Sequence, residues 1–432
     1  MLFRAAVSFL ILALAMAADQ APENPTGCLT EVDLDIDYFP DKVFPQHSQL
    51  WEVEYHKTYK VVTNNNFPDQ KYLLYLCGSE IPVGVGETLA IPIPIQSNGG
   101  YSITTTTAIS HLELMEVDTF AKGYITSPEW IASNCFKDKI EAGDITTVPG
   151  AWSGEAIPES LKDLVTFLNP GSSYSVNLTY PIFVNEYLEK TNLAVGEWHK
   201  FYSAFFNTEK KANQDFDGMT QRYECVSHNA QSLSADSTKK KVIFGSWSDW
   251  SKAWSFGPCP NYYCDWVSDC GGEYLVNDSG FLDDAAFIEY AKDADILLWA
   301  SHGPPYFNET YADKKEVLDQ LKAVQNEMVF DSTKDGLNTW HEHRLVEFDV
   351  VLEDICSIIS GTGLLPHQRE FFRNVFTEEI GSVAECVDGE SSFTLKADEC
   401  VRIGEESSES SSAVRAMASL FSMGTFLWSM IA

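Results

Sequence analysis

One apolar stripe near the middle of this 432-residue chain places the strongest constraint on its fold. Five apolar residues follow one another in steps of four, three, four and three, the period of one face of a long α-helix: Ala212, Phe216, Met219, Tyr223 and Val226. On both sides of this stripe, short apolar segments typical of strands alternate with helical patterns. Such alternation predicts a mostly parallel sheet with helices on its faces. We therefore expect an α/β protein with two lobes joined by one helical segment.

The segment before the stripe predicts the elements of the first lobe. We expect strands over residues 59–62 and 72–76, and helices over residues 105–117 and 158–168. Residues 91–95 read Ile-Pro-Ile-Pro-Ile and are expected to be extended. Proline excludes a helix interior and tolerates only edge pairing in a sheet, so this segment should lie at a sheet edge.

The segment after the stripe repeats the alternation in the second lobe. Strands are expected over residues 241–244 and 296–299, and helices over residues 283–291 and 311–328. Between the first of these strands and the first helix, residues 246–269 are expected to form a long loop that carries several tryptophans and cysteines.

Both ends of the chain carry signals that place it in relation to a membrane. The first seventeen residues are typical of an export signal, because Arg4 precedes an apolar segment and Ala15-Met16-Ala17 matches the small-x-small cleavage pattern. At the other end, a run of Glu and Ser precedes the apolar residues 416–432, and no basic residue follows them. This favours either a glycolipid-anchor signal or a tail-anchoring helix. We therefore expect the folded part at the extracellular face of the plasma membrane or of an endomembrane, anchored at its C-terminus.

These patterns divide the chain into five expected parts. They are a signal peptide over residues 1–17, an N-terminal α/β lobe over 31–193, a connecting helix over 194–232, a C-terminal α/β lobe over 240–400, and a Ser/Glu linker with a membrane anchor or anchor signal over 405–432.

Cysteines and glycosylation sequons agree with export. Three Asn-x-Ser/Thr sequons begin at Asn177, Asn277 and Asn308 and could accept glycans. The ten cysteines are an even number in an exported chain, which favours disulfide bonds. Zinc is the competing interpretation of the cluster around residues 259–270, but its steps match no common zinc-ligand spacing. Cys386 and Cys400 could close a C-terminal loop.

Charge and motifs exclude several classes of function. The formal net charge of −34 would repel a phosphate backbone, so we expect no nucleic-acid partner. The Gly-Lys dipeptide of a Walker loop never occurs, and Gly150–Gly154 has Trp152 where a nucleophile elbow needs serine. His341 and His343 do not have the spacing of a zinc protease. We therefore predict that the chain is not an enzyme and has no cofactor, with a hydrolase site or a cell-surface adhesion module as alternatives.

Several segments resemble class III solute-binding proteins, the extracytoplasmic receptors for cobalamin, haem and iron-siderophores. The segments that carry the resemblance are 157–164, 196–206, 241–245, 270–276, 283–290, 294–298 and 345–354. The resemblance implies two Rossmann-like lobes joined by a long rigid helix, with a ligand cleft between the lobes. The export signal, sequons and terminal anchor are similar to those of the cobalamin acquisition proteins of algae.

Ligand contacts are expected on loops beyond the carboxyl ends of the strands, where open α/β lobes bind their ligands. The aromatic residues predicted to line the cleft are Tyr101, Trp152, Tyr180, Trp247, Trp254, Phe256 and Tyr306. By resemblance, Trp152 matches a tryptophan that stacks on cobalamin in bacterial receptors.

The composition of these loops favours a large, partly apolar ligand. Cobalamin is the first candidate, and haem or siderophore-iron the alternative. A bare ferric ion would need a group of charged oxygen and imidazole ligands, which these loops lack. The implied partners are the small-molecule ligand, the membrane at the C-terminus, and an unidentified membrane transporter or endocytic receptor.

Overall fold

The computed structural model describes residues 21–86, 88–170, 178–275, 280–299, 305–360, 367–387, 389, 396 and 400–403, without the side chains of Trp152 and Ser153. The expected export signal, the segment from residue 405 onward, Asn177 and Asn277 lie outside the described residues. Within that part of the chain, no helix combines the length and apolarity needed to cross a membrane.

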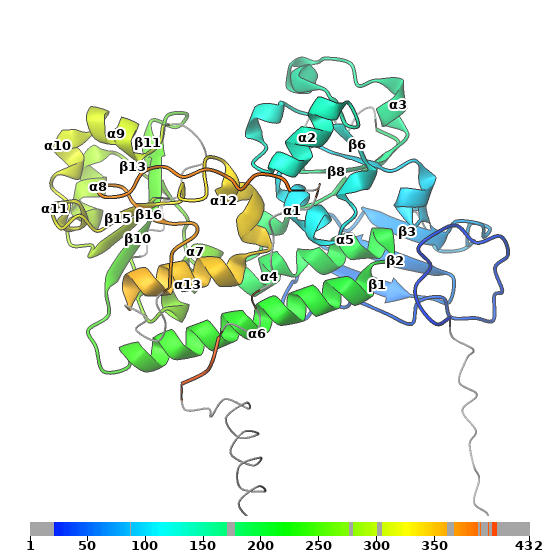
Figure 1. Cartoon of the computed structure of the whole chain (residues 1–432), viewed down its shortest axis with the longest axis horizontal. Helices are drawn as coiled ribbons and strands as arrows, with labels where there is room; N and C mark the ends of the chain where they lie inside the picture. Colours follow the sequence, from blue (N-terminus) through cyan, green and yellow to red (C-terminus); the bar gives the residue numbers. More distant parts are fainter. Residues whose placement is uncertain are drawn as a thin grey trace, which may run out of the picture.

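Two α/β lobes lie above one long helix, α6 (Glu209–Ser234), which runs beneath both of them (Figure 1). All five residues of the apolar stripe are buried on α6, as the sequence predicts. The helices α4 (Asn192–Gly196) and α5 (Trp198–Phe206) precede it, and Asn207 takes a left-handed conformation between α5 and α6. The α5 aromatics belong to the core of the N lobe, whereas the α6 stripe beyond Ala212 belongs to the core of the C lobe.

A five-stranded, fully parallel sheet forms the half of the N lobe that faces the C lobe. Its strand order is β7-β6-β5-β8-β9, with bounds β5 Tyr101–Ile103, β6 Ala121–Tyr124, β7 Thr146–Thr147, β8 Val165–Leu168 and β9 Tyr180–Phe183. The helices of this half are α1 (Thr107–Leu114), α2 (Asn134–Ala142) and α3 (Glu159–Lys162). The α/β architecture expected from the alternation is confirmed here.

The expected helix over residues 158–168 is wrong beyond its first turn. After α3 the chain enters β8, whose four residues are all buried between the neighbouring strands β5 and β9. The apolar residues counted at helical spacing are therefore the continuous apolar run of a central parallel strand, which periodicity alone does not separate from a helix.

The N lobe also contains a second, mostly antiparallel sheet, whereas the sequence predicted a mostly parallel arrangement. β1 (Trp51–Tyr55), β2 (Tyr59–Asn64) and β3 (Lys71–Leu76) are antiparallel, and β4 (Leu89–Ile93) adds in parallel to β3. The predicted strands at 59–62 and 72–76 are confirmed. β4 pairs on one side only, at the edge position that its prolines predict.

The C lobe holds a seven-stranded mixed sheet with a parallel centre. Its strands are β10 (Lys241–Ser248), β11 (Ala253–Phe256), β12 (Glu273–Tyr274), β13 (Phe281–Leu282), β14 (Ile296–Trp299), β15 (Val329–Asp331) and β16 (Arg373–Asn374). β10, β12, β14 and β15 are parallel, whereas β11, β13 and β16 are antiparallel to their neighbours.

Two sequence-based expectations in the C lobe are wrong. The expected loop over 246–269 contains the β10–β11 hairpin and α7 (Tyr262–Asp269). The expected helix over 311–328 is three short helices, α9 (Phe307–Asp313), α10 (Lys315–Leu318) and α11 (Lys322–Gln325). The backbone leaves the helical conformation at Lys314 and becomes extended at Leu321 (φ −84°, ψ 131°), so the helix is broken twice.

The remaining helices are α8 (Asp284–Ala291), α12 (Thr339–Glu342) and α13 (Phe348–Ile359). The expected helix at 283–291 is confirmed, and the Asp283 side chain accepts a hydrogen bond from the Ala286 backbone at its start. α13 packs along α6, so this helix pair closes the lower face of the C lobe (Figure 1).

All ten cysteines form disulfide bonds, as expected for an exported chain: Cys28–Cys77, Cys135–Cys386, Cys225–Cys400, Cys259–Cys264 and Cys270–Cys356. The expected Cys386–Cys400 bond is wrong. Cys386 reaches α2 in the N lobe and Cys400 reaches α6, because proximity in sequence does not determine which thiols meet in space.

Candidate functional site

The two lobes touch each other above α6, where α1 lies against α12 and the following turn, His343–Leu345. The Glu342 side chain is fully buried and accepts hydrogen bonds from the backbone N–H groups of Ala132 (2.8 Å) and Ser133 (2.7 Å). Its backbone carbonyl accepts a hydrogen bond from the Ser110 hydroxyl on α1. We call these four residues the interlobe contact.

A covalent bond reinforces the interlobe contact. The C-terminal segment of the C lobe crosses to the N lobe, drawn in orange in Figure 1, and ends in the Cys135–Cys386 disulfide at the start of α2. The neighbouring Asn134 side chain donates a hydrogen bond to the Ala384 carbonyl (2.9 Å). On the same side, the Asn338 side chain donates to the Glu129 carbonyl (3.0 Å). The lobes are therefore linked both through α6 and across the junction.

Buried ionisable groups surround the interlobe contact. Burial and the nearby Glu342 carboxylate together raise the pKa of Glu113 on α1 to about 8, although the Ser133 hydroxyl opposes the shift. Burial also raises the pKa of Glu347 to about 8. Burial lowers the pKa of His343, but hydrogen bonds to Asp335 and Glu342 outweigh it and bring the pKa to about 10.

A second group of buried polar side chains lies where the strands of the N lobe end. Glu186 follows the carboxyl end of β9, and Thr107 begins α1 just after the carboxyl end of β5. His111, one turn further along α1, stacks on Tyr202 of α5 with 5.1 Å between ring centroids. Glu186, His111 and Tyr202 have no exposed surface. Arg344, which follows α12, acts electrostatically on Glu186 from the C lobe. We call Glu186, His111, Tyr202 and Arg344 the junction cluster.

Burial controls the ionisation of the N-lobe members of the junction cluster. Burial raises the pKa of Glu186, against a smaller lowering by the Thr107 hydroxyl and by the Arg344 charge. Burial and the neighbouring His199 lower the pKa of His111 well below its usual value. Both shifts favour uncharged side chains, which can donate as well as accept hydrogen bonds.

Three of the aromatic residues predicted for the cleft lie in the cores instead. Tyr101 is fully buried on β5, and its hydroxyl donates to the Val117 carbonyl. Trp254 on β11 is fully buried and stacks on Phe287 with 3.9 Å between ring centroids. Phe256, two residues later on the same face, packs on the same ring. Their expected place on ligand loops is wrong, because each belongs to a strand and faces a core.

Trp247 and Tyr306 keep part of their surface exposed. Trp247 lies on β10, and its ring contacts the Trp254 ring edge to face. The Lys314 ammonium lies 4.0 Å from the centroid of the Trp247 ring. Tyr306 precedes α9, and its backbone N–H donates to Glu309. Their role in a ligand site stays a prediction.

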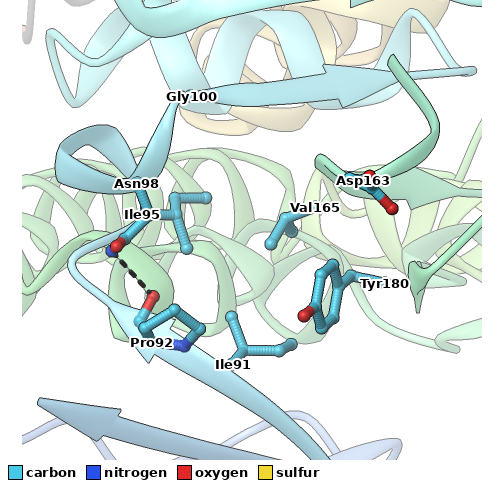
Figure 2. Close-up of a pocket in the computed structure, with 8 residues that line it drawn as sticks. All are labelled: Ile91, Pro92, Ile95, Asn98, Gly100, Asp163, Val165 and Tyr180. Atoms are coloured by element: carbon cyan, nitrogen blue, oxygen red, sulfur yellow. Dashed lines mark hydrogen bonds between the residues drawn. The ribbon is translucent and has the colours of Figure 1, made fainter. Parts of the chain in front are cut away.

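Tyr180 lies at the wrong edge of the sheet for the expected cleft. It lines a pocket of about 270 Å³ with Val165 and six other residues: Ile91, Pro92, Ile95, Asn98, Gly100 and Asp163 (Figure 2). Val165 and Tyr180 are the first residues of β8 and β9, so the pocket opens at the amino ends of these strands. Figure 2 shows Tyr180 beside Ile91 of the second sheet, with Asp163 at the rim.

Trp152 and the sequons are only partly covered by the structure. Trp152 lies in a 3-10 turn over Pro149–Ser153 after β7, and its side chain lies outside the described part. Asn308 is exposed on α9, so its glycosylation stays a prediction. Among the described residues, no group of three or more His, Cys, Asp or Glu side chains is placed to hold a metal ion.

Sequence reasoning missed the interlobe contact and the junction cluster. Glu342 lies between His341 and His343, whose spacing excludes a zinc protease, and Arg344 follows them directly, but no local pattern marks either residue as part of a site. Glu186 lies three residues after the apolar strand β9, so a charged residue just beyond a strand's carboxyl end was the available signal.

Comparison with known proteins gives distant relatives only. No family model matches the chain. An uncharacterized lipoprotein of Methanocaldococcus jannaschii is 26% identical over 194 residues, which cover 43% of this chain and 44% of the relative. A second uncharacterized protein of that organism is 27% identical over 187 residues, which cover 40% of this chain and 51% of the relative. The chain thus spans about half the length of the curated relatives it matches.

The similar solved structures are periplasmic binding proteins. The structural alignment with a periplasmic haem-binding protein of Pseudomonas aeruginosa covers 66% of this chain and 98% of that protein. The two are 9% identical in sequence, with a TM-score of 0.47. The alignment with a possible iron-binding periplasmic solute-binding protein of Staphylococcus epidermidis covers 60% of this chain and 98% of that protein, with 12% identity and a TM-score of 0.44. Each TM-score is below 0.5, so the fold described above rests on the elements of this chain alone.

Proposed function

We propose that this chain is an extracytoplasmic solute-binding protein, which captures one small molecule at the junction of its two lobes and does not transform it. The observation that carries the proposal is the meeting of strand ends from both lobes above α6. Loops that follow the carboxyl ends of β5 and β9 provide Thr107 and Glu186. The chain that leaves β15 leads directly to α12 and Arg344. Ligands of open α/β sheets bind beyond these strand ends.

The polar and apolar groups at the junction support a large ligand with both kinds of surface. With Tyr101, Trp254 and Phe256 in the cores, fewer aromatic rings are left to favour a corrinoid. Cobalamin and the alternative, haem or a ferric siderophore, are therefore equally supported as candidate ligands. Trp152, Trp247 and Tyr306 remain the proposed aromatic contacts.

Cell-surface attachment completes the proposed function. The export signal, the three sequons and the terminal apolar segment support a C-terminally anchored protein on the outer face of a plasma membrane or an endomembrane. A membrane transporter or an endocytic receptor would then receive the solute. Class III solute-binding proteins, which the sequence resembles, are extracytoplasmic receptors for such solutes.

A calorimetric titration tests the proposal directly. The secreted chain, truncated after Ser412, is titrated with cyanocobalamin, haemin and a ferric siderophore. We expect one molecule of one of these solutes to bind per chain and to be recovered unchanged. Absence of binding to all three contradicts the solute assignment, and a new product after incubation would show an enzyme instead.

A further inference from the structure

Arg344 is a buried arginine that forms no ion pair with any carboxylate of the described residues. It is 4% exposed, and its guanidinium carbon lies 4.7 Å from the ring centroid of Tyr262 and 5.6 Å from that of Trp340. One terminal nitrogen is 3.5 Å from the Tyr262 hydroxyl, and Nε has no hydrogen-bond partner. The two rings orient the guanidinium but do not neutralise its charge.

The other arginines of the described part differ from Arg344 in this respect. Each of them forms an ion pair with at least one carboxylate: Arg222 with Asp349 and Glu353, Arg369 with Glu378, Arg373 with Asp331, and Arg402 with Glu224. Arg344 has no carboxylate oxygen within 4.0 Å among the described residues. A protein this acidic offers many carboxylates, so the unpaired state of Arg344 is a specific feature of the junction.

Among the described residues, the N-lobe members of the junction cluster are also short of hydrogen-bond partners. Thr107 lies beside Glu186, yet neither carboxyl oxygen of Glu186 has a well-formed hydrogen bond. The Tyr202 hydroxyl and both ring nitrogens of His111 have none. Glu186 is within electrostatic range of Arg344 but beyond ion-pair distance. Since buried polar groups in native proteins are almost always paired, these groups need hydrogen-bonding partners that the described residues do not supply.

Charge decides what kind of occupant fits. Burial raises the pKa of Glu186 and so disfavours its charge, and among the described residues no carboxylate oxygen lies within 4.0 Å of the Arg344 guanidinium nitrogens. A planar guanidinium matches the two oxygens of a carboxylate or phosphate group. The Tyr202 hydroxyl can donate a further hydrogen bond to the same anion.

We propose that Arg344 recognises an anionic group of the solute, a carboxylate or a phosphate, and that Glu186, Tyr202 and His111 bind the polar atoms beside it. This inference rests on the proposed solute-binding function and adds the chemical class that the solute must contain. Arg344 is provided by the C lobe and the other three residues by the N lobe, so the anion contacts both lobes at once.

Thermal unfolding of the ligand-free protein gives the first test, with Arg222 as the matched control. Arg344→Met removes an uncompensated buried charge, so Tm should equal or exceed that of the wild type. Arg222→Met leaves Asp349 buried without its partner, so Tm should fall. A fall in Tm for Arg344→Met would show a structural role and overturn the proposal.

Anion binding gives the second test, with inorganic phosphate and succinate as probes at constant ionic strength. Both should raise Tm of the wild type, and Arg344→Met should abolish this rise. No rise in the wild type, or an equal rise in the variant, overturns the proposal.

Solute binding separates this inference from the proposed function. Arg344→Met should weaken the binding of haemin or cyanocobalamin, whichever binds, by about tenfold or more. Equal affinity of wild type and variant would keep the solute-binding function and reject the role of Arg344. Anion binding without any binding of the three solutes would keep the anion site and reject the choice of solutes.

Discussion

Replacement of Trp254 by alanine separates its place in the core from its expected place in a ligand cleft. The ring is fully buried, stacks on Phe287 and donates its indole N–H to Asp284 (2.9 Å). Its loss should lower the free energy of unfolding by about 3–5 kcal/mol. Chemical denaturation measures this change.

The control is Trp250, which is 97% exposed at the tip of the β10–β11 hairpin. Trp250→Ala should change the free energy of unfolding by less than about 0.5 kcal/mol. If Trp254→Ala instead leaves stability intact and abolishes solute binding, the cleft interpretation of the sequence regains support.

Glu113 makes stability depend on pH in a defined direction. Its pKa is about 8 in the folded protein against 4.5 for the ordinary side chain, so the folded state keeps a proton that the unfolded chain releases. Glu113 therefore lowers the free energy of unfolding progressively as the pH rises from about 4.5 to about 8, and by a constant amount above that. The groups that face it are Glu342, Ser133, Asp118 and His343.

Glu113→Gln tests this dependence, because the amide has the same shape and does not titrate. Denaturation midpoints of variant and wild type are compared across the same pH window. We expect the variant to gain stability relative to the wild type as the pH rises, and a constant difference between the two proteins would exclude Glu113 as the cause.

At the scale of elements, the Cys135–Cys386 bond should restrict how far the lobes separate. It joins α2 to a segment that belongs to the C lobe, over a sequence separation of 251 residues. The double variant Cys135→Ser with Cys386→Ser should lose about 2–5 kcal/mol of stability and sample wider lobe spacings. Solution scattering of the ligand-free variant should show a larger radius of gyration.

Cys259→Ser with Cys264→Ser is the matched control, because that bond closes only five residues inside the C lobe. It should leave the lobe spacing unchanged. Equal radii of gyration for the wild type and both double variants would mean that the lobes keep their spacing without the Cys135–Cys386 bond.

How far the elements could be predicted from sequence depends on what fixes each of them. α6 and α8 were predictable, because an apolar stripe and an Asp283 cap are local signals. The β10–β11 hairpin was not, because its Trp- and Ser-rich strands are defined by pairing with each other and with β14. The same limit applies to the site: only the fold decides that Tyr101 faces a core and that Glu186 meets Arg344.

At the scale of the whole molecule, lobe closure on binding should be small. α6 spans 26 residues without a break, and the interlobe contact and the Cys135–Cys386 bond already join the lobes. We expect solution scattering with and without solute to give nearly equal radii of gyration. A contraction of several ångströms on binding would contradict a rigid arrangement.

Membrane attachment is tested by truncation after Ser412. The shortened chain should appear in the medium and bind solute with the affinity of the full-length protein. Retention of the shortened chain on cells would reject the C-terminal anchor.

The Cys225–Cys400 bond has a consequence for how the molecule would stand on a membrane. It fixes residues 400–403 against α6, where Asn229 also bonds to Val401 and Ile403. In Figure 1 this short red segment lies below α6, on the opposite side of the molecule from α2 and the top of both lobes. If a membrane anchor follows Ile403, it would therefore be attached to the face of the molecule that carries α6, opposite the top of both lobes.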